Sequence, residues 1–417
     1  MKVIFPTCAG IDVHKKFVVA CRVRMRGRKP EYETRTFSTM RDDLLALAAW
    51  LAEWGCTHVA MESTGVYWQP VFNALEGRFQ VWLVNARHAK AVPGRKTDVH
   101  DAQWLAHLLQ HGLLRPSYIP DRAQRDLRDL VRYRQTLVED RNRIANRIQK
   151  VLEDANIKLA AVVTDIEGVS AQAILRALLA GVTDPRQLAG LAQGKLQRKQ
   201  ADLERALAGT LRAHHRFMLA ELLDHLTLLT RKLDRVEQQM REVLASLPQA
   251  FAEAVERLDT IPGVDVQTAI LIVAEIGVDM SRFPTAKHLS AWAGMAPGNN
   301  ESGGKRRAAH TRNGNRFLRR ALVQAAYPAA RKKESYLKAL FYRLSARRGR
   351  KRAAVAVGRT ILEIAYYLIE RGTTYQELGA SYFDQLDRER ATKRLVGRLR
   401  ALGFTVSLQE VAEGQPA

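Results

Sequence analysis

A leucine seam in the middle of the chain restricts the possible folds more than any other feature. Apolar side chains recur at faultless alternating steps of three and four, at Leu219, Leu222, Leu226, Leu229, Leu233, Val236, Met240 and Val243. This spacing puts them on one stripe of a single helix for more than three heptads. The seam therefore predicts a long helix in a coiled coil, and a helix packed inside a bundle is the alternative.

The sequence before the seam has a different pattern, typical of a mixed sheet. The expected strands are Val3 to Asp12, Phe17 to Met25, Glu31 to Phe37, His58 to Glu62 and Phe79 to Val84, with helices from about Leu44 and Val66. Three strands followed by strands alternating with helices indicate helices packed on a sheet. Because 417 residues exceed one ordinary domain, we expect an α/β domain at 1–120, a helical region at 121–250, a mainly α domain at 251–372 and an extension at 373–417.

The charge balance indicates a polyanionic partner. The chain has 66 Lys and Arg against 43 Asp and Glu, a formal net charge of +23, and such an excess is typical of nucleic-acid-binding proteins. From Gly303 to Arg359 there are 18 basic residues and one acid, Glu334. A solvated helix face is rarely so one-sided, so this stretch is the predicted nucleic-acid surface. Its expected contact residues are Lys305, Arg306, Arg307, Arg312, Arg316, Arg319 and Arg320.

The three cysteines and the lengths of the apolar runs indicate the cellular compartment of the protein. Cys8, Cys21 and Cys56 have no paired metal-binding spacing and lie in apolar surroundings, so they are interpreted as buried thiols of a reducing cytoplasm. No apolar run approaches the roughly 20 residues of a membrane span. Residues 1–6 lack the apolar core of a signal peptide. We therefore expect a soluble intracellular protein.

Four carboxylates occur in positions typical of a metal site. Asp12 and Glu62 end two predicted strands, where ligand crevices of layered sheets open. Asp98 and Asp101 stand three residues apart at a helix start and share one face. Clustered acids raise each other's pKa unless a cation neutralises them, so a pair of magnesium ions is predicted. The alternative is that Asp98 caps the helix and Asp101 is an ordinary first-turn acid.

Motifs at both ends of the chain resemble a known family. The N-terminal motifs are Gly10 to Lys16, Met61 to Tyr67 and Lys96 to Ala102; the C-terminal ones are Ile261 to Val264, Ala293 to Pro297 and Glu301 to Gly303. The first set is similar to the RuvC-like domain of DEDD-type transposases of the insertion-sequence 110 family, and the second set to that family's second domain. The resemblance implies a ribonuclease H-like α/β domain at the N-terminus and a cytoplasmic, nucleoid-associated protein of a prokaryote.

The resemblance also implies a mechanism and partners. Asp12, Glu62, Asp98 and Asp101 match the carboxylates that bind two Mg²⁺ ions, for which Mn²⁺ can substitute, and Ser302 matches the DNA nucleophile. A serine hydroxyl that forms a phosphoserine link conserves bond energy for rejoining. Family members act on double-stranded donor and target DNA, guided by a structured non-coding RNA. They act as oligomers paired through a coiled coil, so a homo-oligomer, either a dimer or a tetramer, is expected.

One C-terminal motif and the overall function leave alternatives open. Pro262-Gly263 resembles the turn of a helix-hairpin-helix unit, which can hold a phosphate at a helix N-terminus; Asp265 replaces the usual second glycine, so a structural cap is the other interpretation. A recombinase is the first functional hypothesis. A hydrolytic RuvC-type nuclease such as a junction resolvase, with Ser302 inactive, is the second. A nucleic-acid-binding protein without activity is the third.

Overall fold

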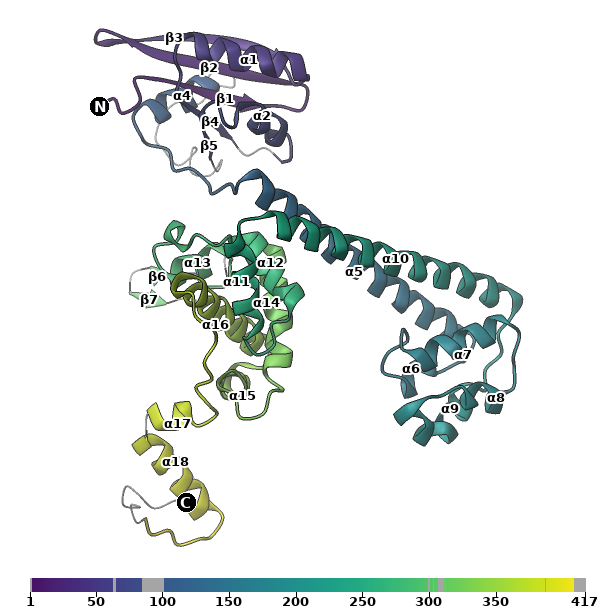
Figure 1. The fold of residues 1–417 in the computed structure, drawn as a ribbon. Coiled ribbons are helices and arrows are strands. Elements are labelled where there is room, and N and C mark those ends of the chain that lie inside the picture. Colours follow the sequence, from purple (N-terminus) through teal and green to yellow (C-terminus); the bar gives the residue numbers. More distant parts are fainter. Residues whose placement is uncertain are drawn as a thin grey trace. The chain divides into compact units, whose positions relative to one another are not determined.

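The computed structural model describes residues 2–62, 65–84, 101–298, 301–302, 304–306, 311, 313–386 and 388–408. Asp98, Arg307 and Arg312 of the predicted site lie outside these residues. The chain divides into two compact units, residues 1–120 and 121–417, whose elements are labelled in Figure 1. Within the described ranges, no helix is both long and apolar enough to cross a membrane.

The first unit contains a mixed five-stranded sheet with the order β3-β2-β1-β4-β5. The strands are β1 (Thr7–Val13), β2 (Phe17–Arg26), β3 (Lys29–Ser38), β4 (His58–Glu62) and β5 (Gln80–Val84). The first three pair antiparallel, while β4 pairs in parallel with both β1 and β5. Gly27 makes the tight turn between β2 and β3 with a φ of 61°, in the left-handed region that favours glycine. The mixed sheet predicted from the strand order is confirmed.

Helices cover both faces of this sheet. The helices α1 (Arg41–Glu53) and α2 (Trp68–Leu75) share one apolar core with alternate residues of β1 and β4, such as Ile11 and Met61. The helix α4 (Asp101–Gln110) packs on the opposite face, where Cys8 and Ala60 contribute to a second core. This arrangement, a mixed sheet between helices, is consistent with the predicted ribonuclease H-like fold.

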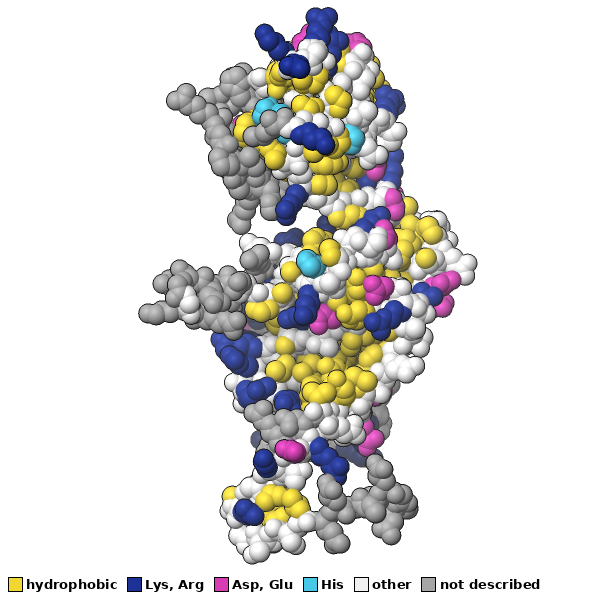
Figure 2. Space-filling view, turned by 90° about the vertical axis from the view of Figure 1, so that its left-hand side faces the viewer, with side chains coloured by type: hydrophobic (Ala, Val, Ile, Leu, Met, Phe, Trp, Pro, Cys, Tyr) yellow, Lys and Arg dark blue, Asp and Glu magenta, His cyan; other side chains and the backbone are white. Residues whose placement is uncertain are grey.

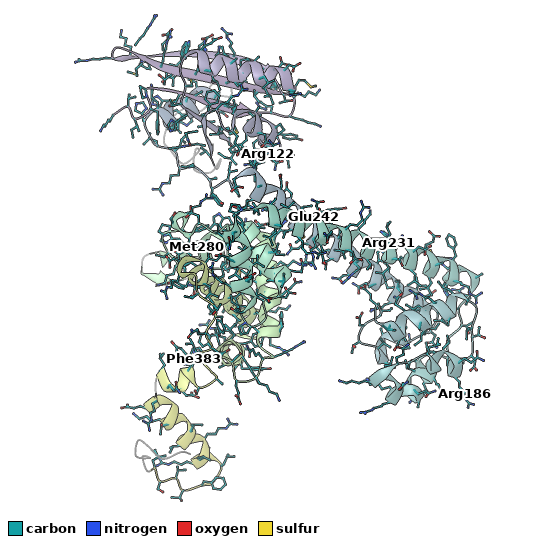
Figure 3. The ribbon with its side chains drawn as sticks, viewed as in Figure 1. Arg122, Arg186, Arg231, Glu242, Met280 and Phe383 are labelled. Atoms are coloured by element: carbon teal, nitrogen blue, oxygen red, sulfur yellow. The ribbon has the colours of Figure 1, made fainter. Side chains whose placement is uncertain are left out.

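The second unit begins with a helical arm. Its two long helices, α5 (Arg122–Asp154) and α10 (Ala213–Ser246), lie side by side, and short helices join them at the far end of the arm (Figure 1). The connecting helices are α6 (Leu159–Val162), α7 (Val169–Leu179), α8 (Pro185–Gly190), η2 (Gly194–Lys199) and α9 (Gln200–Ala206). Figure 3 shows Arg231 and Glu242 along α10 and Arg186 among the short helices.

The leucine seam is buried inside this arm. Leu219, Leu226 and Leu233 of α10 are at most 5% exposed, and they share one core with Ile144 and Ile148 of α5. The prediction of a single long helix is therefore confirmed. Its partner is a helix of the same chain, as in the bundle alternative, because α5 carries a matching apolar stripe. The packing gives no support to a seam that stays open for a second copy.

A helical body follows the arm. It consists of α11 (Gln249–Asp259), α12 (Val266–Ile276), η3 (Met280–Arg282), α13 (Ala286–Trp292), α14 (Arg316–Ala329), α15 (Tyr336–Arg348) and α16 (Arg350–Arg371). These helices share a large apolar core that also takes in Leu127 and Val131 from the first turns of α5. A short hairpin, β6 (Glu301–Ser302) and β7 (Lys305–Arg306), lies between α13 and α14. The chain continues through α17 (Tyr382–Leu386) and α18 (Arg388–Ala401), and Phe383 stacks on Tyr336 of the body.

Candidate active site

The strand register brings two predicted carboxylates to the same edge of the sheet. The parallel ladder of β1 and β4 ends with the pair Ile11 and Met61, and Asp12 and Glu62 are the next residue on each strand. Neighbouring strands lie about 4.8 Å apart, and residues in register project to the same face. Ile11 and Met61 face the core of α1 and α2, so Asp12 and Glu62 project to the α4 face. Both side chains are half-buried.

The packing of α4 brings a third carboxylate to that edge. The helix runs antiparallel to β1: Gln110 O accepts from Ile4 N at 2.8 Å, and Ala106 O lies 3.6 Å from the Cys8 thiol. A Cβ at Gly10 would lie 2.2 Å from Ala102 O, so the helix rests directly on the strand backbone there. Each contact further along β1 toward Asp12 therefore involves a residue nearer the start of α4, and Asp101 is the first residue of that helix. Asp101 therefore begins the helix at the end of the sheet where Asp12 and Glu62 lie.

These residues have the donor chemistry of a site for a hard divalent cation, namely carboxylate oxygens on rigid elements. Within the described part of the chain, no group of three or more His, Cys, Asp or Glu side chains is placed to hold a metal. Asp12, Glu62 and Asp101 all lie within that part, so the structure brings them to one end of the sheet without closing them into a metal-holding cluster. Asp98, the fourth acid, lies outside it, and the full set stays a prediction. Asp12 Oδ2 lies 3.0 Å from Nε2 of the half-exposed His14, a neighbour that its place two residues after a strand-end acid could have indicated.

The serine predicted as nucleophile lies in the short hairpin of the helical body. Ser302 pairs with Lys305 across β6 and β7, and Gly304 supplies a left-handed turn residue with a φ of 74°. An antiparallel bridge between Pro297 and Thr311 closes the base of the segment that carries this hairpin. Ser302 is thus held on a loop whose two limbs are joined.

Comparisons with known proteins agree with both halves of this description. A model for the DEDD transposase domain, described as "Transposase", matches residues 9–157. A second model, described as "Transposase IS116/IS110/IS902 family", matches residues 255–342. The chain belongs to the IS110 family of transposases. It is therefore an enzyme of DNA transposition, and its DEDD-type family implies that it uses a divalent metal.

Several relatives are similar over most of this transposase. The transposase for insertion sequence element IS1111A of Coxiella burnetii is 28% identical over 378 residues, 88% of this chain and 90% of the relative. An IS110 protein of Streptomyces coelicolor is 28% identical over 70% of this chain and 76% of its own length. The pilin gene-inverting protein of Moraxella bovis is 23% identical over 89% of this chain and 98% of its own. These similarities extend through the arm as well as both matched domains.

The predicted basic contacts of the transposase are only partly free of internal partners. Arg316 is exposed and lies 4.7 Å from the ring of Phe317. Arg320 forms an ion pair with Glu139 of α5, and Arg319 is half-buried. The space-filling view shows Lys and Arg side chains (dark blue) spread over the face of both units (Figure 2). The choice of Lys305, Arg306 and their neighbours as nucleic-acid contacts stays a prediction.

The Pro262-Gly263 turn is built as a structural element. Asp265 caps α12, because its Oδ1 accepts from Thr268 N at 2.8 Å. A Cβ at Gly263 would lie 2.4 Å from Ala325 O, so the turn packs against the backbone of α14. The helix N-terminus already has a carboxylate at the position that a phosphate would need, which favours the cap interpretation over the phosphate one.

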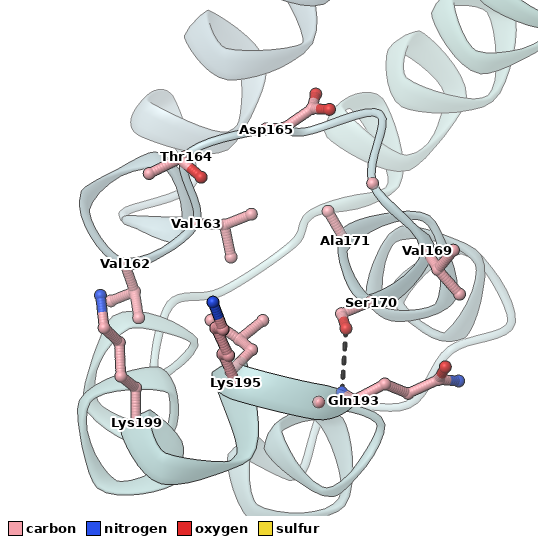
Figure 4. Close-up of a pocket in the computed structure, with 13 residues that line it drawn as sticks. Val162, Val163, Thr164, Asp165, Val169, Ser170, Ala171, Gln193, Lys195 and Lys199 are labelled. Atoms are coloured by element: carbon pink, nitrogen blue, oxygen red, sulfur yellow. Dashed lines mark hydrogen bonds between the residues drawn. The ribbon is translucent and has the colours of Figure 1, made fainter. Parts of the chain in front are cut away.

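A pocket opens at the far end of the arm, and none of the described site residues lines it. Its volume is about 590 Å³, and Lys195, Lys199 and Ser170 line it with apolar residues (Figure 4). The Ser170 hydroxyl accepts from Gln193 N at 2.9 Å. None of the proposed carboxylates or the hairpin contributes to this pocket, so we assign it no part in the chemistry.

One buried charge near the serine loop was not predicted from the sequence. Glu275 is fully buried near the end of α12, and Arg132 of α5 donates to both of its carboxylate oxygens at 2.7 and 2.8 Å. A single acid inside the apolar run Ala269 to Ile276 was the available signal. Acids are almost never fully buried unless they are paired, so such an acid indicates a partner elsewhere in the chain.

Proposed function

We propose that this transposase is an RNA-guided recombinase that cuts and rejoins double-stranded donor and target DNA with a serine nucleophile. Asp12, Glu62, Asp98 and Asp101 would hold two Mg²⁺ ions, with Mn²⁺ able to substitute, and Ser302 would attack the DNA backbone. The observation that most directly supports the proposed metal site is the antiparallel packing of α4 on β1. The helix that begins at Asp101 starts from the end of the sheet at which the strands reach Asp12 and Glu62.

In this scheme the residues of the chain have separate roles. When bound, the metal ions would neutralise phosphate charge and favour loss of the serine proton. The Ser302 hydroxyl oxygen forms an ester with phosphorus while one P–O bond of the DNA strand breaks, and the oxygen that leaves takes up a proton to become a free hydroxyl end of the DNA. The phosphoserine keeps the bond energy, so rejoining needs no outside energy source. The basic residues Lys305, Arg306 and Arg307 would stabilise the charge on phosphate during both steps.

The proposed partners follow from charge and from the family. A net charge of +23 suits two polyanions, the DNA and a structured non-coding guide RNA. A homo-oligomer, either a dimer or a tetramer, is proposed as well. Because the seam of α10 is buried against α5, contact between copies through the arm would use its outer side, where Phe217 and Leu228 are exposed.

The decisive experiment for the serine uses the full chain, purified with its own nucleic acid. Ser302→Ala is expected to form no covalent protein–DNA adduct on a denaturing gel and no recombinant, with DNA binding unchanged. Ser246→Ala, which removes an exposed hydroxyl at the end of α10, is the matched control and should react normally. Full recombination by Ser302→Ala would show that water is the nucleophile, as in the hydrolytic resolvase alternative.

Two further measurements test the metal set and the guide. Asp98→Ala is expected to lose all cleavage, whereas cleavage at the normal rate would return this residue to a capping role. Sequencing of the nucleic acid that co-purifies with the chain should yield one discrete structured RNA. Absence of such an RNA would contradict the guided mechanism and favour the resolvase alternative.

A further inference from the structure

A buried network in the helical body joins α5, α12 and the start of α14. Besides the two hydrogen bonds from Arg132, the Glu275 carboxylate lies 3.4 Å from Nε of Arg128. Arg128 also donates to the carbonyl oxygens of Ala274 and Glu275 at 3.2 and 2.9 Å. The end of α12 is therefore tied to α5 by two guanidinium groups, and the carboxylate has no contact with solvent.

Asn315 connects this network to the chain that returns from the serine loop. Its Nδ2 donates to Glu275 Oε2 at 2.6 Å. Its Oδ1 accepts from the backbone N–H groups of Phe317 and Leu318, both at 3.1 Å, and so caps α14. The oxygen and the nitrogen of the Asn315 amide thus have separate roles, because capping needs only the oxygen. The donor half fixes where the cap residue sits relative to α12.

The segment just before Asn315 is fixed by backbone contacts as well. A Cβ at Gly314 would lie 2.3 Å from Gly294 N, so this residue packs directly on the end of α13. Three residues earlier, Thr311 is bridged to Pro297 at the base of the loop. Together with Asn315, these contacts hold the returning limb of the segment that carries Ser302. The position of the hairpin base therefore depends on where Asn315 is held.

A contribution to stability alone does not explain why this charge is buried here. A buried ion pair gives little net stability compared with a well-packed apolar group, because desolvation offsets the attraction. What a carboxylate adds is direction: its Oε2 accepts from both Arg132 and Asn315 and so links α5 to the start of α14. This geometry suits a device that sets the position of the N-cap of α14.

We propose that Glu275 and Asn315 are positioning residues of the transposase, which hold the returning limb of the loop so that Ser302 meets the phosphodiester in line. The proposal rests on the serine mechanism proposed above. Neither residue touches DNA in this scheme. They act through the Asn315 cap and the Gly314 contact, and a displacement of about 1 Å at a nucleophile can slow a reaction about 100-fold.

Substitutions at Asn315 separate the link from the cap. Asn315→Ser keeps a capping oxygen and removes only the donor to Glu275. Asn315→Asp also keeps the cap but places a second carboxylate beside a buried one, where like charges repel. Asp265→Ser, at the N-cap of α12, is the matched control because it exchanges a cap without altering the network. Each full-length variant is purified with its bound nucleic acid.

The measurement is the single-turnover rate of covalent adduct formation, together with the DNA concentration that gives half the maximal rate. Asn315→Ser should form adduct about 10 to 100 times more slowly, and Asn315→Asp more slowly still. Half-saturation should change by less than about twofold, because no DNA contact is removed. Asp265→Ser should react at the normal rate. A role confined to stability would instead leave the saturated rate of folded Asn315→Ser unchanged.

Three outcomes are distinguishable as failures. A normal adduct rate for Asn315→Ser, with Ser302→Ala inactive in the same assay, would overturn the positioning role and leave the serine mechanism in place. Recombination by Ser302→Ala would overturn the serine mechanism itself. A slow Asn315→Ser whose half-saturation has risen in proportion would also overturn the proposal, because it would show lost DNA binding rather than misplacement.

Discussion

The sheet unit and the helical body place their proposed catalytic residues by different kinds of interaction. In the sheet unit, Asp12 and Glu62 are positioned by a ladder of backbone hydrogen bonds, and α4 rests on the bare backbone of Gly10. In the helical body, the limb that leads from Ser302 is held by the side chains of Glu275 and Asn315, in addition to the backbone contacts of Gly314 and Thr311. The arrangement in the sheet unit depends on Gly10 having no Cβ. The arrangement in the helical body depends on the charge and the hydrogen-bond donors of particular side chains.

This difference predicts different sensitivities. A sheet edge set by register tolerates many side-chain changes, since each backbone hydrogen bond survives them, but an added methyl group at a close backbone contact forces the helix away. A buried charge network reacts to the change of a single atom even when the shape is kept, because an unpaired buried ion is costly. Substitutions that add one carbon or exchange one oxygen therefore separate the two arrangements.

The largest effect on stability is expected from Glu275→Gln in the helical body. The substitution keeps the shape but removes the negative charge that faces Arg128 and Arg132, and breaking a buried pair costs about 3–5 kcal/mol. Urea unfolding of the full chain should show the loss in the transition of the helical unit. The control Glu253→Gln removes a half-exposed carboxylate that pairs with Arg257 at 2.9 Å, and it should cost less than about 1 kcal/mol of the free energy of unfolding. Equal small losses in both variants would contradict the role of the buried network.

The sheet unit was the more predictable of the two from the sequence. Its strands were expected within a few residues of their observed ends, and His58 to Glu62 coincides with β4. Alternating apolar residues and a turn glycine are local signals, and each is sufficient to indicate a strand or a turn. The placement of α4 followed only in part, because the sequence indicated the helix but not its contact with Gly10.

The helical character of the second unit and its long helix α10 follow from the sequence, but its connections do not. The seam of α10 indicated a long helix, and nothing in its spacing distinguished a second chain from α5, since both present an apolar stripe. The role of Glu275 is not evident from the sequence because its partners Arg132 and Asn315 lie 143 and 40 residues away along the chain. Such contacts form only in the assembled fold, and their only signal in the sequence is a single acid within an apolar run. The placement of Asp98 and the role of Ser302 stay predictions.

A smaller loss is expected from Gly10→Ala in the sheet unit. The added Cβ would lie 2.2 Å from Ala102 O and 2.4 Å from Ala106 N, which are backbone atoms that cannot rotate away. Overpacking of this kind lowers the free energy of unfolding by about 1–3 kcal/mol. The shift of α4 would also move Asp101, so the rate of DNA cleavage should fall even in the folded variant. Gly190→Ala is the control, because nothing lies within 4 Å of its added Cβ, and it should behave like the parent.

Thiol labelling gives a second readout for the same variant. Burial raises the pKa of the Cys8 thiol above its ordinary value and that of Cys56 to about 12. Both are therefore protonated and shielded at pH 8, and the parent protein should label slowly. Because Cys8 lies against Ala106 in the α4 interface, Gly10→Ala should speed labelling of Cys8 and leave Cys56, in the core on the opposite face, unchanged. Unchanged labelling of Cys8 would show that the helix had not moved.

The smallest effect is expected from Asp265→Ala, which tests whether side chains in the helical body serve the fold or the nucleic acid. Removing the cap of α12 should cost about 1 kcal/mol, and Asp184→Ala, which removes the Asp cap of α8 in the arm, should cost a similar amount. DNA affinity at fixed salt should stay within about twofold for both, since phosphate contacts dominate that affinity and neither change adds or removes one. A phosphate held at the Pro262-Gly263 turn would instead be repelled by Asp265. Removing the Asp265 carboxylate would then raise the DNA affinity of the Asp265→Ala variant alone. Such a rise would turn this part of the body from a structural element into a nucleic-acid contact.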